Sequence, residues 1–178
     1  MMPQPARSPM HPIDSYLAAI ESLLKQIIRH GGFDLALTIQ RASSAPEGGE
    51  ATFEAPEVVV AFSGPDSDLL LEARAELLNA LEYVVLRAVR LEEDLFGKIT
   101  FDCQDWRRLR MEELKLMAQV AAERVAETKD PYPLAPMSPR ERRIIHLALK
   151  DQPAVRTVSE GFGSERRVVI YPAPTPRE

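Results

Sequence analysis

The sequence predicts an α+β protein built from two small α/β sandwich domains. The chain has 178 residues and 45% hydrophobic content, enough for one domain or two small ones. Stretches with apolar residues at every third or fourth position alternate with stretches in which apolar and polar residues alternate. The charge is also uneven, because residues 1–130 hold 14 Lys+Arg against 22 Asp+Glu, whereas residues 131–178 hold 8 against 5. This difference favours a basic unit joined to an acidic one.

The first domain is predicted to span residues 13–103. It follows a proline-rich segment, residues 1–12, that we expect to be disordered. Apolar residues recur at helical spacing over residues 13–29, and Gly31 and Gly32 end that helix. Residues 33–41 and 51–62 predict two strands joined by a long polar loop. A helical region over 69–91 and a short strand over 98–103 follow.

The second domain is predicted to span residues 104–172, and residues 173–178 are expected to form a frayed tail. A helix is expected over 106–128, followed by a linker or edge strand at 130–133. Ser138 and Glu141 have the spacing of a capping box, and Pro139 suits the first helical position, so a helix begins there. Residues 154–160 and 166–171 alternate around a glycine-containing turn, which predicts a hairpin.

Arg142 and His146 lie four residues apart on the helix that begins at Ser138, so they are expected side by side and facing solvent. A guanidinium is a forked donor to phosphate, and an imidazole can hydrogen-bond or stack against a sugar or base. The pair could equally be two solvated side chains with no function.

The residues around this helix resemble the R-x3-H (Arg-x-x-x-His) domain, which binds single-stranded nucleic acid. The resemblance covers Leu134–Pro139, Thr157–Gly161 and Glu165–Ile170, and Glu-Arg-Arg before two isoleucines is similar to the bacterial Jag group (SpoIIIJ-associated proteins). It implies single-stranded RNA or DNA as partner and a three-stranded sheet backed by helices. By this resemblance the signature residues that bind nucleic acid are Arg142 and His146. We expect a field of positive charge around them from Arg140, Arg143, Lys150, Arg156 and Arg167. Arg167 rather than Arg166 is expected on the same side as the helix pair.

The first domain resembles a type II KH domain, with the order αββααβ. A KH domain holds phosphates on a Gly-x-x-Gly loop, but the corresponding residues here are Glu72-Ala73-Arg74-Ala75. Arg74 is the one candidate contact in this loop. A Glu in place of a glycine repels phosphate, so we expect this unit to be a scaffold or a protein interface, for which another KH-type protein is a candidate partner.

The composition argues against several other classes. A single cysteine, Cys103, excludes an internal disulfide and suits a reducing cytoplasm, and the scattered histidines give no metal-ligand spacing. No catalytic constellation, cofactor motif, signal peptide or membrane-spanning run is recognisable, so no cofactor, small-molecule substrate or membrane is expected. The leading hypothesis is a cytoplasmic, non-enzymatic single-strand-binding protein that regulates RNA metabolism or cell growth. The alternative is an assembly factor whose nucleic-acid surfaces are relics.

Overall fold

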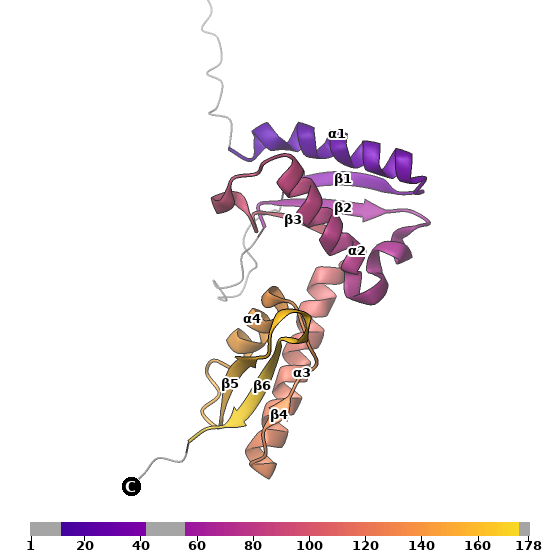
Figure 1. Ribbon diagram of the computed structural model, residues 1–178. Coiled ribbons are helices and arrows are strands. Elements are labelled where there is room, and N and C mark those ends of the chain that lie inside the picture. Colours follow the sequence, from indigo (N-terminus) through magenta and orange to yellow (C-terminus); the bar gives the residue numbers. More distant parts are fainter. Residues whose placement is uncertain (1–11, 42–55, 175–178) are drawn as a thin grey trace, which may run out of the picture. The chain divides into compact units, whose positions relative to one another are not determined.

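The computed structural model describes residues 12–41 and 56–174 (Figure 1). Within these ranges the chain forms two compact units, with the boundary after Trp106, slightly beyond the Cys103 boundary predicted from the sequence. The predicted disorder of residues 1–12 and 173–178 falls almost entirely outside the described residues, as does the polar loop of the first hairpin. Each unit is described by itself below.

The first unit has the predicted order of helices and strands. It contains α1 (Asp14–Gly31), β1 (Ala36–Arg41), β2 (Val58–Ser63), α2 (Ser67–Ala88), the 3-10 turn η1 (Glu93–Leu95) and β3 (Ile99–Cys103). Gly32, with φ 70°, closes α1, as the glycine pair predicted. The strand order is β1-β2-β3, with β1 antiparallel and β3 parallel to the central β2.

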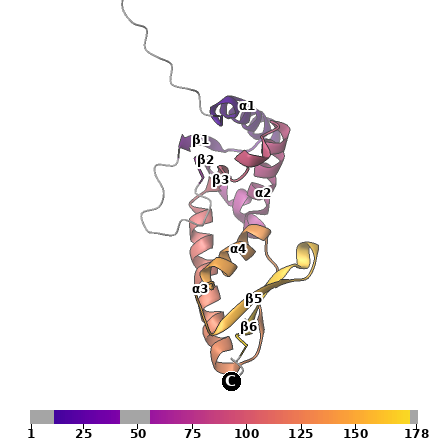
Figure 2. The same ribbon diagram turned by 90° about the vertical axis from the view of Figure 1, so that its left-hand side faces the viewer.

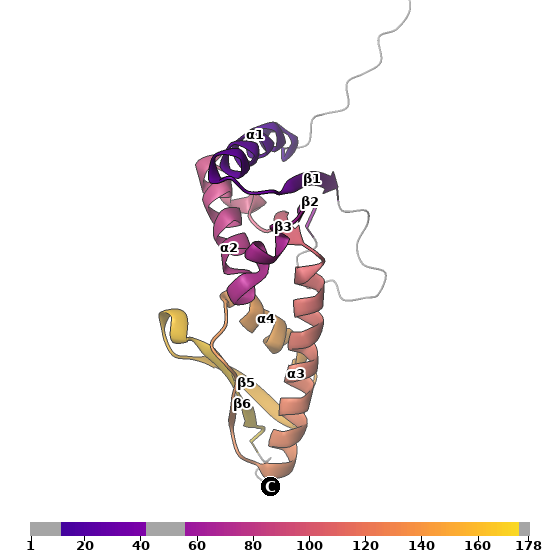
Figure 3. The ribbon, with the colours of Figure 1, turned by 90° about the vertical axis from the view of Figure 1, so that its right-hand side faces the viewer.

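The helices of the first unit pack on one face of its sheet (Figures 2 and 3). Val58, Val60 and Phe62 alternate along β2 with less buried residues, so one face of the strand enters the core. On β3, Ile99, Phe101 and Cys103 are buried in the core, and Thr100 between them is buried as well. Ile20 and Leu24 of α1 are fully buried in the same cluster, which accounts for the apolar period of residues 13–29.

The chain of α2 breaks at Glu72–Ala75, the residues that the sequence predicts to stand in place of a Gly-x-x-Gly loop. Glu72 is extended, with ψ 154°, and Ala73, Arg74 and Ala75 all have positive φ, between 48° and 63°. A left-handed conformation costs a non-glycine residue about 1–2 kcal/mol. Two helical segments are therefore joined by a turn made without glycine, at this cost.

The second unit contains α3 (Trp106–Thr128), β4 (Tyr132–Pro133), α4 (Pro139–Ala148), β5 (Val155–Glu160), the 3-10 turn η2 (Gly163–Glu165) and β6 (Arg167–Pro172). Its antiparallel sheet has the order β4-β6-β5, and both helices lie on one side of it (Figures 2 and 3). Leu114 and Val125 of α3, Ile145 of α4 and the β6 pair Val168 and Ile170 are buried between the layers. The predicted α+β class, with two small sheets backed by helices, is confirmed.

No helix among the described residues is long and apolar enough to cross a lipid bilayer. Cys103 is buried in the first core, and burial is the main cause that raises the pKa of its thiol.

Candidate nucleic-acid interface

The capping box at the start of α4 is present as predicted. The backbone N–H of Glu141 donates to Oγ of Ser138 at 3.3 Å, and the backbone N–H of Ser138 donates to Oε2 of Glu141 at 2.9 Å. Pro139 occupies the first turn, where a missing N–H leaves no bond unmade. These contacts fix where α4 begins and therefore which residues share a face.

Arg110 of α3 links this helix to α4. Its Nε donates to Oε1 of Glu141 at 2.8 Å, and another guanidinium nitrogen donates to Glu113 at 2.7 Å. Burial alone would raise the pKa of Glu141, but the bonds from Ser138 and Arg110 outweigh it and lower that pKa. Cations are unfavourable at the start of a helix, but those at the start of α3 have acidic partners. Arg108 pairs with Glu112 at 3.1 Å, and Arg110 pairs with Glu113.

Arg142 is half-buried and carries an unused hydrogen-bond donor. Its Nε is buried and makes no hydrogen bond with any residue in the described ranges. A buried donor left unpaired costs about 1–3 kcal/mol, and the cost is larger for charged groups. The guanidinium as a whole is only half-buried, and a guanidinium donates well to anions such as a phosphate.

His146 is held by β5 rather than offered freely to solvent. Its Nδ1 lies 2.6 Å from Oγ1 of Thr157, and its Nε2 lies 2.9 Å from Oγ of Ser159. Burial first, and then the positive charge of Arg142, lower the pKa of the imidazole, so its neutral form is favoured. The expectation of a pair facing solvent is therefore wrong in this respect: both side chains are half-buried, and both ring nitrogens of the histidine are engaged.

Three of the other predicted cations lie on or just after α4. Arg140, Arg143 and Lys150 are exposed. At about 100° per residue, Arg143 lies on the flank of α4 next to the Arg142/His146 edge, and Arg140 lies further round. Lys150 follows the end of the helix. They place positive charge beside the half-buried guanidinium.

The remaining predicted arginines of the second unit face the other side of the sheet. Thr157 and Ser159, which bind His146, pair in register with Ile170 and Val168, so these four share the helix-facing side. Arg156 pairs with Tyr171, and Arg167 pairs with Glu160, on the opposite side. The expectation that Arg167 shares the side of the helix pair is therefore wrong.

Arg156, Tyr171 and Glu160 interact with one another on the outer face of the sheet. The guanidinium of Arg156 lies 4.6 Å from the centre of the Tyr171 ring, and the Tyr171 hydroxyl donates to Glu160 at 2.6 Å. Glu160 adds an acidic group to this face. Arg156 and Arg167 are therefore separate from the Arg142/His146 edge.

Sequence reasoning missed Thr157, Ser159 and Arg110 as parts of this site. The alternation of residues 154–160 does place Val155, Thr157 and Ser159 on one face, which is a usable signal for the two hydroxyls. The Arg110–Glu141 bond joins residues 31 positions apart, and no local pattern indicates it.

Comparison with known protein families matches residues 112–172 to the R-x3-H domain. This stretch contains α4, the hairpin and both signature residues. Residues 112–172 form an R-x3-H domain. The resemblance of this part of the chain to that family is thereby confirmed.

Two curated relatives extend the similarity beyond the R-x3-H domain. The chain is 35% identical over 114 residues to the RNA-binding protein KhpB of Clostridium symbiosum, covering 64% of this chain and 51% of the relative. It is 34% identical over 111 residues to the RNA-binding protein KhpB of Bacillus subtilis, covering 61% and 53%. The chain thus spans about half the length of these relatives, and their similarity fits the predicted Jag group.

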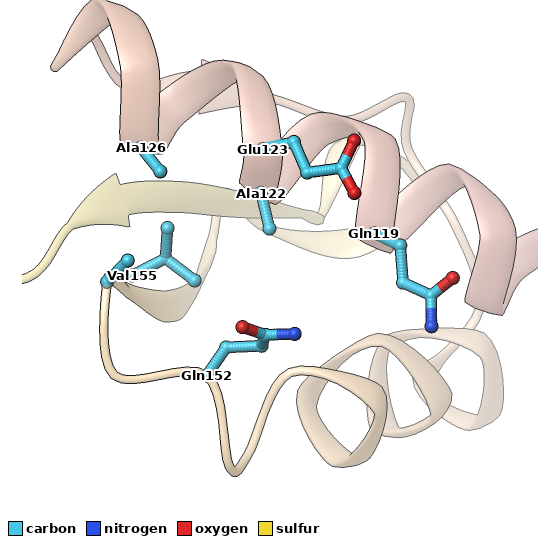
Figure 4. Close-up of a pocket in the computed structure, with 7 residues that line it drawn as sticks. Gln119, Ala122, Glu123, Ala126, Gln152 and Val155 are labelled. Atoms are coloured by element: carbon cyan, nitrogen blue, oxygen red, sulfur yellow. The ribbon is translucent and has the colours of Figure 1, made fainter.

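A hollow in the R-x3-H domain is lined by neither signature residue (Figure 4). It is lined by Gln119, Ala122, Glu123 and Ala126 of α3 and by Gln152, Ala154 and Val155 before and in β5. The lining has one charged residue, the acidic Glu123, and no cation. It is therefore unsuited to hold a phosphate.

We expect Arg142→Gln to raise the pKa of His146 toward its ordinary value near 6.5. The charge of Arg142 disfavours the imidazolium, and removing it leaves burial as the remaining cause of the lowered pKa. A proton NMR titration of the ring signal, assigned with His146→Gln, measures the shift. Arg108→Gln, on the opposite helix of the layer and paired with Glu112, should leave the midpoint unchanged; equal midpoints in the parent and Arg142→Gln would contradict the expected coupling.

Proposed function

We propose that the protein binds single-stranded nucleic acid, RNA foremost, through the α4–β5 edge of its R-x3-H domain. The observation that carries this proposal is the half-buried guanidinium of Arg142, whose Nε has no partner among the described residues, with the exposed cations Arg140, Arg143 and Lys150 near it in the chain. RNA is favoured because the curated relatives are named RNA-binding proteins.

Arg142 and His146 have different roles at this edge, since one binds the ligand and the other positions a strand. Arg142 donates to a phosphate oxygen, and the exposed Arg140, Arg143 and Lys150 supply the surrounding positive field. His146, neutral and bound to Thr157 and Ser159, fixes β5 beside Arg142. The two hydroxyls keep spare acceptor capacity, which suits a sugar hydroxyl of the strand.

The same geometry argues against a catalytic role for His146. A general base needs an acidic group that orients the imidazole, as in the Ser-His-Asp arrangement. Here both ring nitrogens of His146 contact hydroxyls, and neither contacts a carboxylate of a described residue. The residues are arranged to bind rather than to transfer a proton.

Binding should favour single strands and weaken with salt. A site that neutralises about three phosphates gives a slope of log affinity against log salt of roughly −0.7 per contact, with a Kd on the order of 10⁻⁴ to 10⁻⁶ M at physiological salt. Fluorescence anisotropy with labelled single-stranded and duplex oligonucleotides, at low and moderate salt, measures both properties. Equal affinity for both forms, or a slope near zero, would contradict a phosphate-based single-strand site.

A second candidate function, protein interaction, is favoured by the surface of α2 in the first unit. Leu69, Leu77, Tyr83 and Val84 are large, exposed and apolar. The loop position of α2 carries the exposed Glu72, which disfavours phosphate there. A unit that serves as a protein interface and an R-x3-H domain that binds RNA are compatible in one chain, so Arg74 stays a predicted contact without a defined role.

A further inference from the structure

Phe162 stands at the tip of the β5–β6 hairpin with 91% of its surface exposed. It is the most exposed of the large apolar side chains in the described ranges. Turn positions usually take Gly, Asn, Asp, Ser or Pro, and an aromatic ring there gains nothing from burial. The packing of the domain therefore does not explain why a phenylalanine stands at this position.

The hairpin tip is ordered, so the ring has a defined place. Gly161 has φ 86°, and a Cβ at this position would lie 2.9 Å from the backbone oxygen of Glu165. The backbone N–H of Glu165 donates to the oxygen of Phe162 at 3.1 Å, and that of Arg166 donates to the oxygen of Gly163 at 3.3 Å. These contacts build the short turn η2 and fix the chain on both sides of the ring.

The tip lies at the same end of the domain as Arg142. The segment that enters α4 runs beside β6, because the N–H of Leu134 donates to the oxygen of Val168 at 2.9 Å and that of Met137 to the oxygen of Arg166 at 3.1 Å. The start of α4 is therefore tied to the tip end of the hairpin.

Two steps from the contact between His146 and Ser159 lead toward that end. Along α4, Arg142 precedes His146 by about 6 Å of helix rise. Along β5 and the turn, Phe162 follows Ser159 by roughly 10 Å of extended chain. Both residues therefore lie on the tip side of the His146–Ser159 contact.

We propose that Phe162 is a stacking platform for one base of the strand whose phosphate is held by Arg142. An exposed aromatic face next to cationic groups is the combination that holds single strands without reading their sequence, since every base has a π face. Arg166, exposed and close to the tip in the chain, adds positive charge there. This inference rests on the proposed function and adds a base contact to a site otherwise made of phosphate contacts.

The test compares Phe162→Ala, Phe162→Leu and Phe162→Trp in the full chain, by anisotropy with a labelled single-stranded RNA and the same strand containing abasic positions. Stacking is worth about 1–3 kcal/mol per base, so Phe162→Ala should weaken binding by about 5-fold or more. Phe162→Leu should bind as weakly as Phe162→Ala, and Phe162→Trp at least as well as the parent. The abasic strand should bind the parent and Phe162→Ala equally.

The salt dependence separates this inference from the proposed function. Phe162→Ala removes no charge, so its salt slope should equal that of the parent, whereas Arg142→Gln should lose about 0.7 of slope. If Arg142→Gln weakens binding and Phe162→Ala does not, the stacking role is overturned and the phosphate site stands. If Phe162→Leu binds RNA as well as the parent, the ring is an apolar contact, as for a protein partner, and base stacking is overturned. Leu116→Ala, another exposed apolar residue of the R-x3-H domain, is the matched control and should bind as the parent does.

Discussion

Arg142→Gln should weaken binding of single-stranded RNA by about 10-fold or more while the R-x3-H domain stays folded. A hydrogen bond to a charged group is worth about 1.5–3 kcal/mol, and the proposed site depends on this one buried fork. The substitution should not unfold the domain, because the Nε of Arg142 makes no bond with a described residue that could be lost. Anisotropy titration measures the affinity, and far-UV circular dichroism measures the helix and sheet content.

Two further variants show whether charge or geometry is responsible. Arg142→Lys keeps the charge as a single point but loses the fork, so its affinity should lie between those of the parent and Arg142→Gln. Arg108→Gln removes an exposed arginine that pairs with Glu112, and it should change the affinity by less than about 2-fold. If Arg142→Gln binds RNA as the parent does, the nucleic-acid proposal fails and the protein-interaction candidate gains support.

Glu141→Ala should destabilise the R-x3-H domain by about 2–4 kcal/mol. The substitution removes half of the capping box, and losing a cap costs typically ~1 kcal/mol. It also leaves Arg110 without its partner on α4; this side chain is only 14% exposed, and bonds between charged groups at such sites contribute about 1.5–3 kcal/mol. Urea denaturation followed by the NMR amide signals of residues 155–160 reports the free energy of unfolding of this domain alone.

The matched control is Glu112→Ala, which removes an exposed carboxylate from a pair on the surface of α3. Exposed pairs contribute about 0–1 kcal/mol, so this variant should change stability little. Equal losses in both variants would show that the Arg110–Glu141 contact has no special weight.

The pH dependence of stability gives the same carboxylate a second readout. The folded-state pKa of Glu141 is lowered, so its stabilising contribution is fully present above the unfolded pKa near 4.3 and is lost as the pH falls through the folded pKa. Glu141→Gln, which can still cap the helix, should therefore show a weaker loss of stability on acidification than the parent.

Much of the fold follows from local patterns. The apolar period of residues 13–29, the glycines that end α1 and the capping box at Ser138 each act over a few residues, so the sequence alone predicted α1 and α4. The alternation of residues 154–160 and 166–171 predicted the β5–β6 hairpin for the same reason. The sequence also predicted a loop at Glu72–Ala75, and the backbone there takes positive φ at three residues that are not glycine.

The sequence by itself thus determined the α+β class, the helix that carries Arg142 and His146, and the type of ligand these residues suit. Only the tertiary structure decided what surrounds them. It assigned Thr157 and Ser159 to the two nitrogens of His146, joined Arg110 to Glu141, and put Arg167 on the far side of the sheet. The physical reason is that strand register and helix packing bring together residues far apart in the chain, and a local pattern carries no information about which face meets which.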